Sequence, residues 1–101
     1  MNRPYLKAKK VKTVTQICKE NIKRNGINTE IMKYFEEAAE LQDAVSKFYA
    51  GKDTVAHIAE EIADLRIMLE QLEIIFNCRE LVQEWREKKL VQLAEDVEKG
   101  D

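Results

Sequence analysis

The chain has 101 residues, the size of one domain, and a domain this small buries only a limited apolar core when it folds alone. Charged residues make up 36% of it and only three glycines and one proline occur, so the composition predicts helices with short connections and argues against a β-rich fold. The net charge of −2 is too small to indicate a nucleic-acid or membrane-surface partner. We therefore expect no stable nucleic-acid complex.

The sequence carries no signal for export or membrane insertion. No apolar run reaches the roughly 18 residues that a membrane-spanning helix needs, and the N-terminus lacks the apolar centre of a signal peptide. Cys18 and Cys78 stand far apart, without the CxxC spacing of a zinc site. We expect a cytoplasmic protein with two buried free thiols and no membrane association.

A basic lead, residues 1–12, precedes the first helical signal, and we assign it no structure. Thr13 and Gln16 match a capping box, in which each side chain accepts a hydrogen bond from the backbone amide of the other residue. Gly26 supplies a stop signal. This pattern predicts a first helix over about residues 13–25.

Two longer helices follow, with a tight connection between them. Asn28 or Thr29 is expected to cap the first of the two, which keeps an apolar residue at each helical turn as far as Ala50. Residues 51–53 form the connection. The next helix, residues 55–76, is apolar nearly all round, which is typical of a helix buried in a bundle or an oligomer interface. We expect this helix to be central.

A fourth, amphipathic helix is predicted over residues 79–98. The expected fold class is all-α, a four-helix bundle-like protomer with antiparallel central helices. We expect a single domain over residues 13–98. Because the chain is small and its third helix is so apolar, we also expect it to associate with further copies of itself.

Acidic residues crowd together in the predicted second and third helices. Glu37 and Glu40 stand three residues apart in the second helix, as do Glu61 and Asp64 in the third, so each pair shares one face of its helix. Similar pairs later in the sequence stand among lysines and arginines that can neutralise them. The two earlier pairs stand beside alanines and leucines instead.

The spacing of the two pairs places them at one height in a helical hairpin. Glu40 precedes Gly51 by eleven residues and Asp64 follows Asp53 by eleven, which brings both about 16 Å from the turn. Four unpaired carboxylates in an apolar bundle would repel one another and resist desolvation, so they would bind either protons or a cation.

The residue types indicate which cation would fit. Oxygen-only ligation favours Mg²⁺, with Mn²⁺ as an alternative, and no histidine follows at the ExxH spacing of di-iron bundles. His57 is expected on the helix surface rather than as a ligand. The competing interpretation is a solvated acidic face, in which Lys33 pairs with Glu37 one turn away.

The segments EEAAEL (residues 36–41) and EEIADL (residues 60–65) resemble the ExxE and ExxD motifs of the MazG-like all-α nucleotide pyrophosphohydrolases, and the resemblance extends over about residues 21–93. It implies an all-α NTP pyrophosphatase fold and hydrolysis of a nucleoside triphosphate between the α and β phosphates, giving a monophosphate and pyrophosphate. It also implies a homodimer or homotetramer. The implied Mg²⁺ ligands are Glu37, Glu40, Glu61 and Asp64.

The resemblance implies further roles around the metal. Glu36 or Glu60 would orient or deprotonate the attacking water, and the sequence leaves the choice between them open. Lys88 and Lys89 would bind the substrate phosphates, in a segment similar to the KLxRL pattern of the family. Gln92 stands where this pattern has its arginine.

Two other functions compete with this one. Phosphoribosyl-ATP pyrophosphohydrolase is similar in length and in its acidic helix pair, although its lysines before the first acidic motif are matched only by Lys23 and Lys33. The second alternative is a non-catalytic helical interaction protein, whose acidic surface docks a basic partner.

Overall fold

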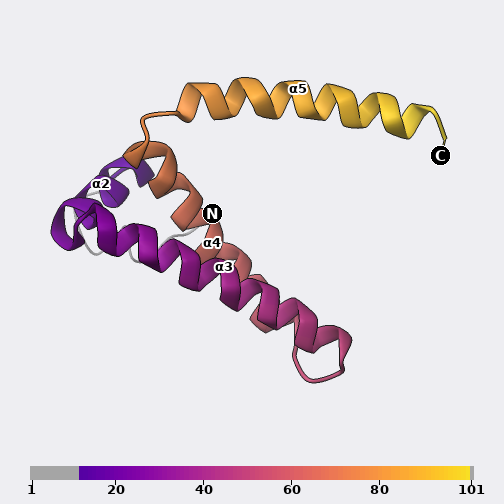
Figure 1. The fold of residues 1–101 in the computed structure, drawn as a ribbon, viewed down its shortest axis with the longest axis horizontal. Helices are drawn as coiled ribbons and strands as arrows, with labels where there is room; N and C mark the ends of the chain where they lie inside the picture. The colour runs from indigo at the N-terminus through magenta and orange to yellow at the C-terminus, as the bar shows by residue number, and fades with distance from the viewer. Residues whose placement is uncertain (1–11, 101) are drawn as a thin grey trace.

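The computed structural model describes residues 12–100, so the predicted basic lead lies outside the described residues except for Lys12. Four α-helices make up this part of the chain, and it contains no strand (Figure 1). The predicted all-α class is therefore confirmed. The helices are α2 (Val14–Asn25), α3 (Ile27–Tyr49), α4 (Val55–Ile75) and α5 (Arg79–Glu98).

Side-chain caps start α2 and α4, and the cap of α2 is the predicted capping box. The Gln16 amide donates to Thr13 Oγ1 at 3.1 Å and the Thr13 amide donates to Gln16 Oε1 at 2.8 Å, which completes the capping box. Thr54 Oγ1 accepts from the amide of His57 at 3.2 Å. These bonds satisfy amides that have no partner within the first helical turn.

The start of α3 differs from the prediction, because neither Asn28 nor Thr29 caps it. Gly26 joins α2 and α3 directly: its amide donates to the Ile22 carbonyl at 2.8 Å, and its carbonyl accepts from the Glu30 amide at 3.2 Å. Its φ of 90° is a conformation that residues with a Cβ rarely adopt. One glycine thus ends the first helix and begins the second, and no linker remains to supply a capping side chain.

The α3 and α4 helices form an antiparallel hairpin, and they make the most extensive helix contact in the described chain (Figure 1). The α2 helix packs against both of them where α3 begins and α4 ends. The α5 helix extends away from this three-helix unit, and its backbone approaches only α4 (Figure 1). The predicted antiparallel central pair is confirmed, whereas α5 does not lie along it.

Few apolar side chains are buried in a single chain. Among the described residues, the buried apolar side chains are those of Cys18, Ala44 and Met68. The α4 helix is central, as predicted, yet Ile62 and Ile67 are 39% and 53% exposed. The α5 helix buries no residue at all. The apolar side chains of α5 and some of those of α4 are therefore uncovered within one chain.

The two cysteines are free and differ in their surroundings. Cys18 is buried, as predicted, and this burial raises the pKa of its thiol. Cys78, in contrast, is only half-buried at the start of α5. None of the described helices is both long enough and apolar enough to cross a membrane.

A buried polar network holds α2, α3 and α4 together. Glu30 is completely buried and Gln71 is 2% exposed. Asn21 Nδ2 donates to Glu30 Oε1 and to Gln71 Oε1, each at 2.8 Å, and Gln71 Nε2 donates to Glu30 Oε1 at 2.7 Å. Asn25 Nδ2 donates to Glu30 Oε2 at 3.1 Å. Amide donors thus replace the water that this carboxylate lost on burial.

The network predicts a large effect of Gln71→Leu. The substitution removes one donor from the Glu30 carboxylate and one acceptor from Asn21, so we expect the free energy of unfolding to fall by about 2 kcal/mol. Urea unfolding followed by circular dichroism measures it. The matched control is Gln42→Leu on the exposed surface of α3, which should change stability by less than about 0.5 kcal/mol. Equal effects of the two substitutions would contradict the role of the network.

Candidate metal centre

The hairpin brings together the acidic residues of its two helices. Glu37 of α3 and Glu61 and Asp64 of α4 each place a carboxylate oxygen within 4.8 Å of the others. Glu40 lies close enough to hydrogen bond with Glu37 and Glu61, and its charge raises the pKa of both. Antiparallel pairing of the two helices thus brings together Glu37, Glu61 and Asp64, while Glu40 lies beside them, exposed and outside the group of three.

Burial makes this cluster electrostatically unfavourable without a counter-ion. Glu61 is 6% exposed, and the Oε2 atoms of Glu61 and Glu37 are buried without a hydrogen-bond partner. Burial raises the pKa of Glu37, and the charges of Glu40, Asp64 and Glu61 raise it further. Burial likewise raises the pKa of Glu61, with added repulsion from Glu40 and Asp64. The folded chain therefore favours a cation or a proton at this point.

A solvated acidic face, the competing interpretation, would need its charges exposed or paired. In the described part of the chain no ion pair joins Lys33 to Glu37. Glu40 is exposed and Glu61 has an ion-pair contact with His57, but Glu61 itself is buried rather than solvated. A set of carboxylate oxygens from two helices is instead a donor set that hard divalent cations prefer.

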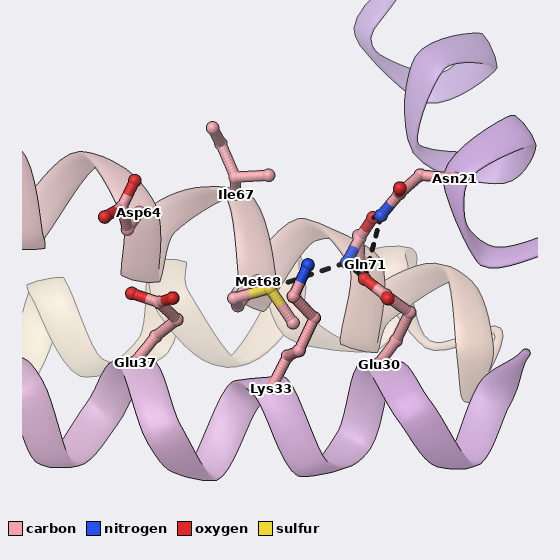
Figure 2. A pocket seen from close by; sticks show the side chains of 8 residues that line it. All are labelled: Asn21, Glu30, Lys33, Glu37, Asp64, Ile67, Met68 and Gln71. Atoms are coloured by element: carbon pink, nitrogen blue, oxygen red, sulfur yellow. Dashed lines mark hydrogen bonds between the residues drawn. The ribbon is translucent and has the colours of Figure 1, made fainter. Parts of the chain in front are cut away.

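A cavity of about 190 Å³ opens beside the cluster, between α2, α3 and α4. The Glu37 and Asp64 carboxylates face each other at one end, and the Asn21–Glu30–Gln71 network borders the other (Figure 2). Lys33 extends from α3 between these two ends (Figure 2). The cavity is lined by Asn21, Glu30, Lys33, Glu37, Asp64, Ile67, Met68 and Gln71.

The sequence indicated the acidic end of this cavity and missed its other end. Asn21 and Gln71 are fifty residues apart, so helical spacing within the sequence could not predict the 2.8 Å hydrogen bond between them. The available signal was a polar residue, Gln71, within the most apolar run of the chain. Such a residue needs a buried partner, because an unpaired amide in a core is strongly unfavourable.

The other predicted site residues lie around or away from the cluster. Glu60 offers an oxygen within 4.8 Å of ligand atoms of Glu61 and His57, whereas Glu36 is exposed and belongs to neither acidic group. Lys88 and Lys89 lie on α5, where their Nζ atoms stand 5.2 and 5.9 Å from the centre of the Trp85 ring. Within one chain, α5 does not place these lysines beside the acids (Figure 1).

His57 is exposed, as predicted, but it also contacts the cluster. Its Nδ1 lies 2.7 and 2.9 Å from the two carboxylate oxygens of Asp53, and its Nε2 lies 3.3 Å from Glu61 Oε1. The hydrogen bond to Asp53 raises the pKa of His57, and the bond from His57 lowers that of Asp53. The sequence signal for this contact was the spacing of four between these residues, which places them on successive helical turns.

The chain and its structure show an all-α protein with four described helices and two overlapping groups of side chains that could hold a metal ion, one of three acids and one of two acids with His57. Comparison of the chain with protein-family models, curated proteins and solved structures finds no match. A functional assignment therefore rests on the residues and geometry of the site itself.

The raised pKa of Glu61 predicts how stability depends on pH without metal. A carboxylate whose pKa is raised by folding destabilises the folded state at pH values above the raised pKa. This loss of stability disappears as the pH falls towards 4.5, the ordinary pKa of a glutamate. Glu61→Gln should therefore raise the unfolding temperature at about pH 7.5, and the advantage should shrink towards about pH 5. Thermal unfolding in chelator measures this, with Glu84→Gln on α5 as the exposed control. Destabilisation by Glu61→Gln at the higher pH would contradict the assignment.

Proposed function

We propose that this protein is a MazG-like, Mg²⁺-dependent nucleoside triphosphate pyrophosphohydrolase that cleaves between the α and β phosphates and releases a monophosphate and pyrophosphate. The observation that carries the proposal is the pairing of the ExxE and ExxD carboxylates across α3 and α4, with two buried oxygens that lack any partner. This arrangement agrees with the resemblance of the two motifs to that family.

Four residues, Glu37, Glu40, Glu61 and Asp64, would hold Mg²⁺ or Mn²⁺. A bound divalent ion neutralises phosphate oxygens and makes a bound water more acidic. Glu60 is better placed than Glu36 to orient or deprotonate that water, because it lies within 4.8 Å of Glu61. The protein itself supplies no nucleophile, which suits phosphoanhydride hydrolysis, where charge neutralisation and alignment matter most.

The cavity beside the cluster supports a nucleotide substrate. Lys33 supplies a positive charge for a phosphate oxygen, and Ile67 and Met68 supply apolar surface for part of a nucleoside. A volume of about 190 Å³ is smaller than the roughly 300 Å³ of pockets that enclose whole drug-sized ligands. The cavity would therefore hold one part of the nucleotide, with the triphosphate near Glu37 and Asp64.

The activity assay has a matched control on α5. Glu40→Gln and Asp64→Asn should each lower Mg²⁺-dependent pyrophosphate release by about 100-fold or more with unchanged helicity, because each removes a metal ligand. Chelation of the metal should abolish release in the unmodified protein. Asp96→Asn removes an exposed acid of α5 and should leave the rate unchanged. Full activity in both cluster variants would refute the assignment of the site.

A substrate panel completes this experiment. Nucleoside and deoxynucleoside triphosphates are compared with phosphoribosyl-ATP at equal Mg²⁺ concentration, with pyrophosphate as the readout. Turnover of phosphoribosyl-ATP alone would assign the protein to that reaction instead. If millimolar Mg²⁺ and Mn²⁺ show no binding in calorimetry, the non-catalytic acidic docking protein becomes the better assignment.

The proposal includes assembly into a homodimer or homotetramer. The α5 helix exposes large apolar side chains along its length, among them Trp85 at 58%, Leu90 at 46% and Leu93 at 58%. Large apolar side chains exposed in this number on one helix favour an interface between proteins. A second copy seated on these faces would also bring Lys88 and Lys89 next to a neighbouring chain.

Light scattering after gel filtration measures this assembly. The unmodified protein should have two or four times the 11.8 kDa chain mass. Leu90→Glu should shift it towards the monomer, because a charge buried in an apolar interface is strongly unfavourable. The neighbouring Gln92→Glu adds the same charge at an already polar position and should have a smaller effect. A monomeric unmodified protein would contradict the proposed assembly.

A further inference from the structure

Three side chains form a row on successive turns where α4 begins. Asp53 Oδ2 lies 2.7 Å from His57 Nδ1, and His57 Nε2 lies 3.3 Å from Glu61 Oε1. Asp53 also accepts from the amide of Thr54 at 2.7 Å, which ties its carboxylate to the helix start. The imidazole is thus held on one side and touches the acidic cluster with the other.

Helix stability alone does not explain a histidine at this position. His57 is the third residue of α4, and its side chain is 44% exposed. A protonated imidazole in a first turn opposes the positive end of the helix dipole. Thr54 already accepts from the His57 amide, so the helix start has its cap without the imidazole.

The contact with His57 can orient the Glu61 side chain. Glu61 is 6% exposed and has little access to water that could fix its orientation instead. His57 engages Oε1, while Oε2 remains buried and unpartnered. A glutamate side chain has several rotatable bonds, and a fixed contact at one oxygen restricts the other. Carboxylates that bind metal ions are commonly oriented by contacts with residues that are not themselves ligands.

We propose that His57, held by Asp53, is a positioning residue that fixes the Glu61 carboxylate so that its free oxygen serves the cation site. The effect of His57 on cation binding rests on the proposed function, whereas its effect on the orientation of Glu61 does not. The direction in which cation affinity changes when His57 is replaced distinguishes positioning from a simple charge effect. Removing a nearby positive charge would tighten the binding of a cation, whereas loss of positioning weakens it.

The experiment compares His57→Leu and His57→Gln in the full chain. The first removes the contact to Glu61, and the second keeps a neutral N–H donor of similar reach. Mn²⁺ alone is the probe, titrated by calorimetry and electron paramagnetic resonance. We expect the Mn²⁺ affinity of His57→Leu to fall about 10-fold, and His57→Gln to retain most of the affinity. Unchanged or tighter binding in His57→Leu overturns the proposal.

A matched control and a second readout accompany the titration. Lys19→Gln removes an exposed positive charge of α2 and should leave the affinity unchanged. The ¹³C shift of the Glu61 carboxyl group reports its surroundings without metal. It should move in His57→Leu and stay near its original value in His57→Gln and Lys19→Gln.

The second readout separates the two proposals. If the unmodified protein binds no Mn²⁺, the pyrophosphohydrolase proposal fails, and a carboxyl shift confined to His57→Leu still supports positioning. If the Glu61 shift is the same in all variants, positioning is overturned whether or not the metal binds.

Discussion

The antiparallel packing of α3 against α4 is the constraint on which the rest of the structure depends. It buries Ala44 completely and places the acids of two separate motifs within 4.8 Å of one another. Neither helix alone could form the cluster, because each contributes only one face with two carboxylates. The same packing closes one side of the cavity and provides the surface against which α2 docks.

Burial of carboxylates is unfavourable, and the structure deals with it differently at Glu30 and at the cluster of Glu37 and Glu61. Glu30 is completely buried, yet amide donors of three side chains surround its carboxylate, so it serves as structure. Glu37 and Glu61 lie beside other acids and keep unpartnered oxygens, and repulsion raises the pKa of both. Functional sites often contain groups that lower the stability of the fold. The unfavourable cluster of acids therefore supports a cation centre.

The incomplete core has its own consequence. The α5 helix leaves the three-helix unit with none of its residues buried, and in the proposed assembly another copy of the chain would cover the exposed apolar side chains of α4 and α5. Assembly and catalysis are therefore linked in the proposed function. Lys88 and Lys89 stand on the one helix that a single chain does not place near its acids.

The sequence by itself determined the helices, the capping box at Thr13 and the acidic motifs, because caps and helical spacing act over a few residues. It also predicted the meeting of the motifs, since a short connection leaves two long helices little choice except antiparallel packing. Only the tertiary structure decided the bond between Asn21 and Gln71 and the direction of α5. Those features depend on side-chain orientation and on packing between distant segments, which local spacing does not encode.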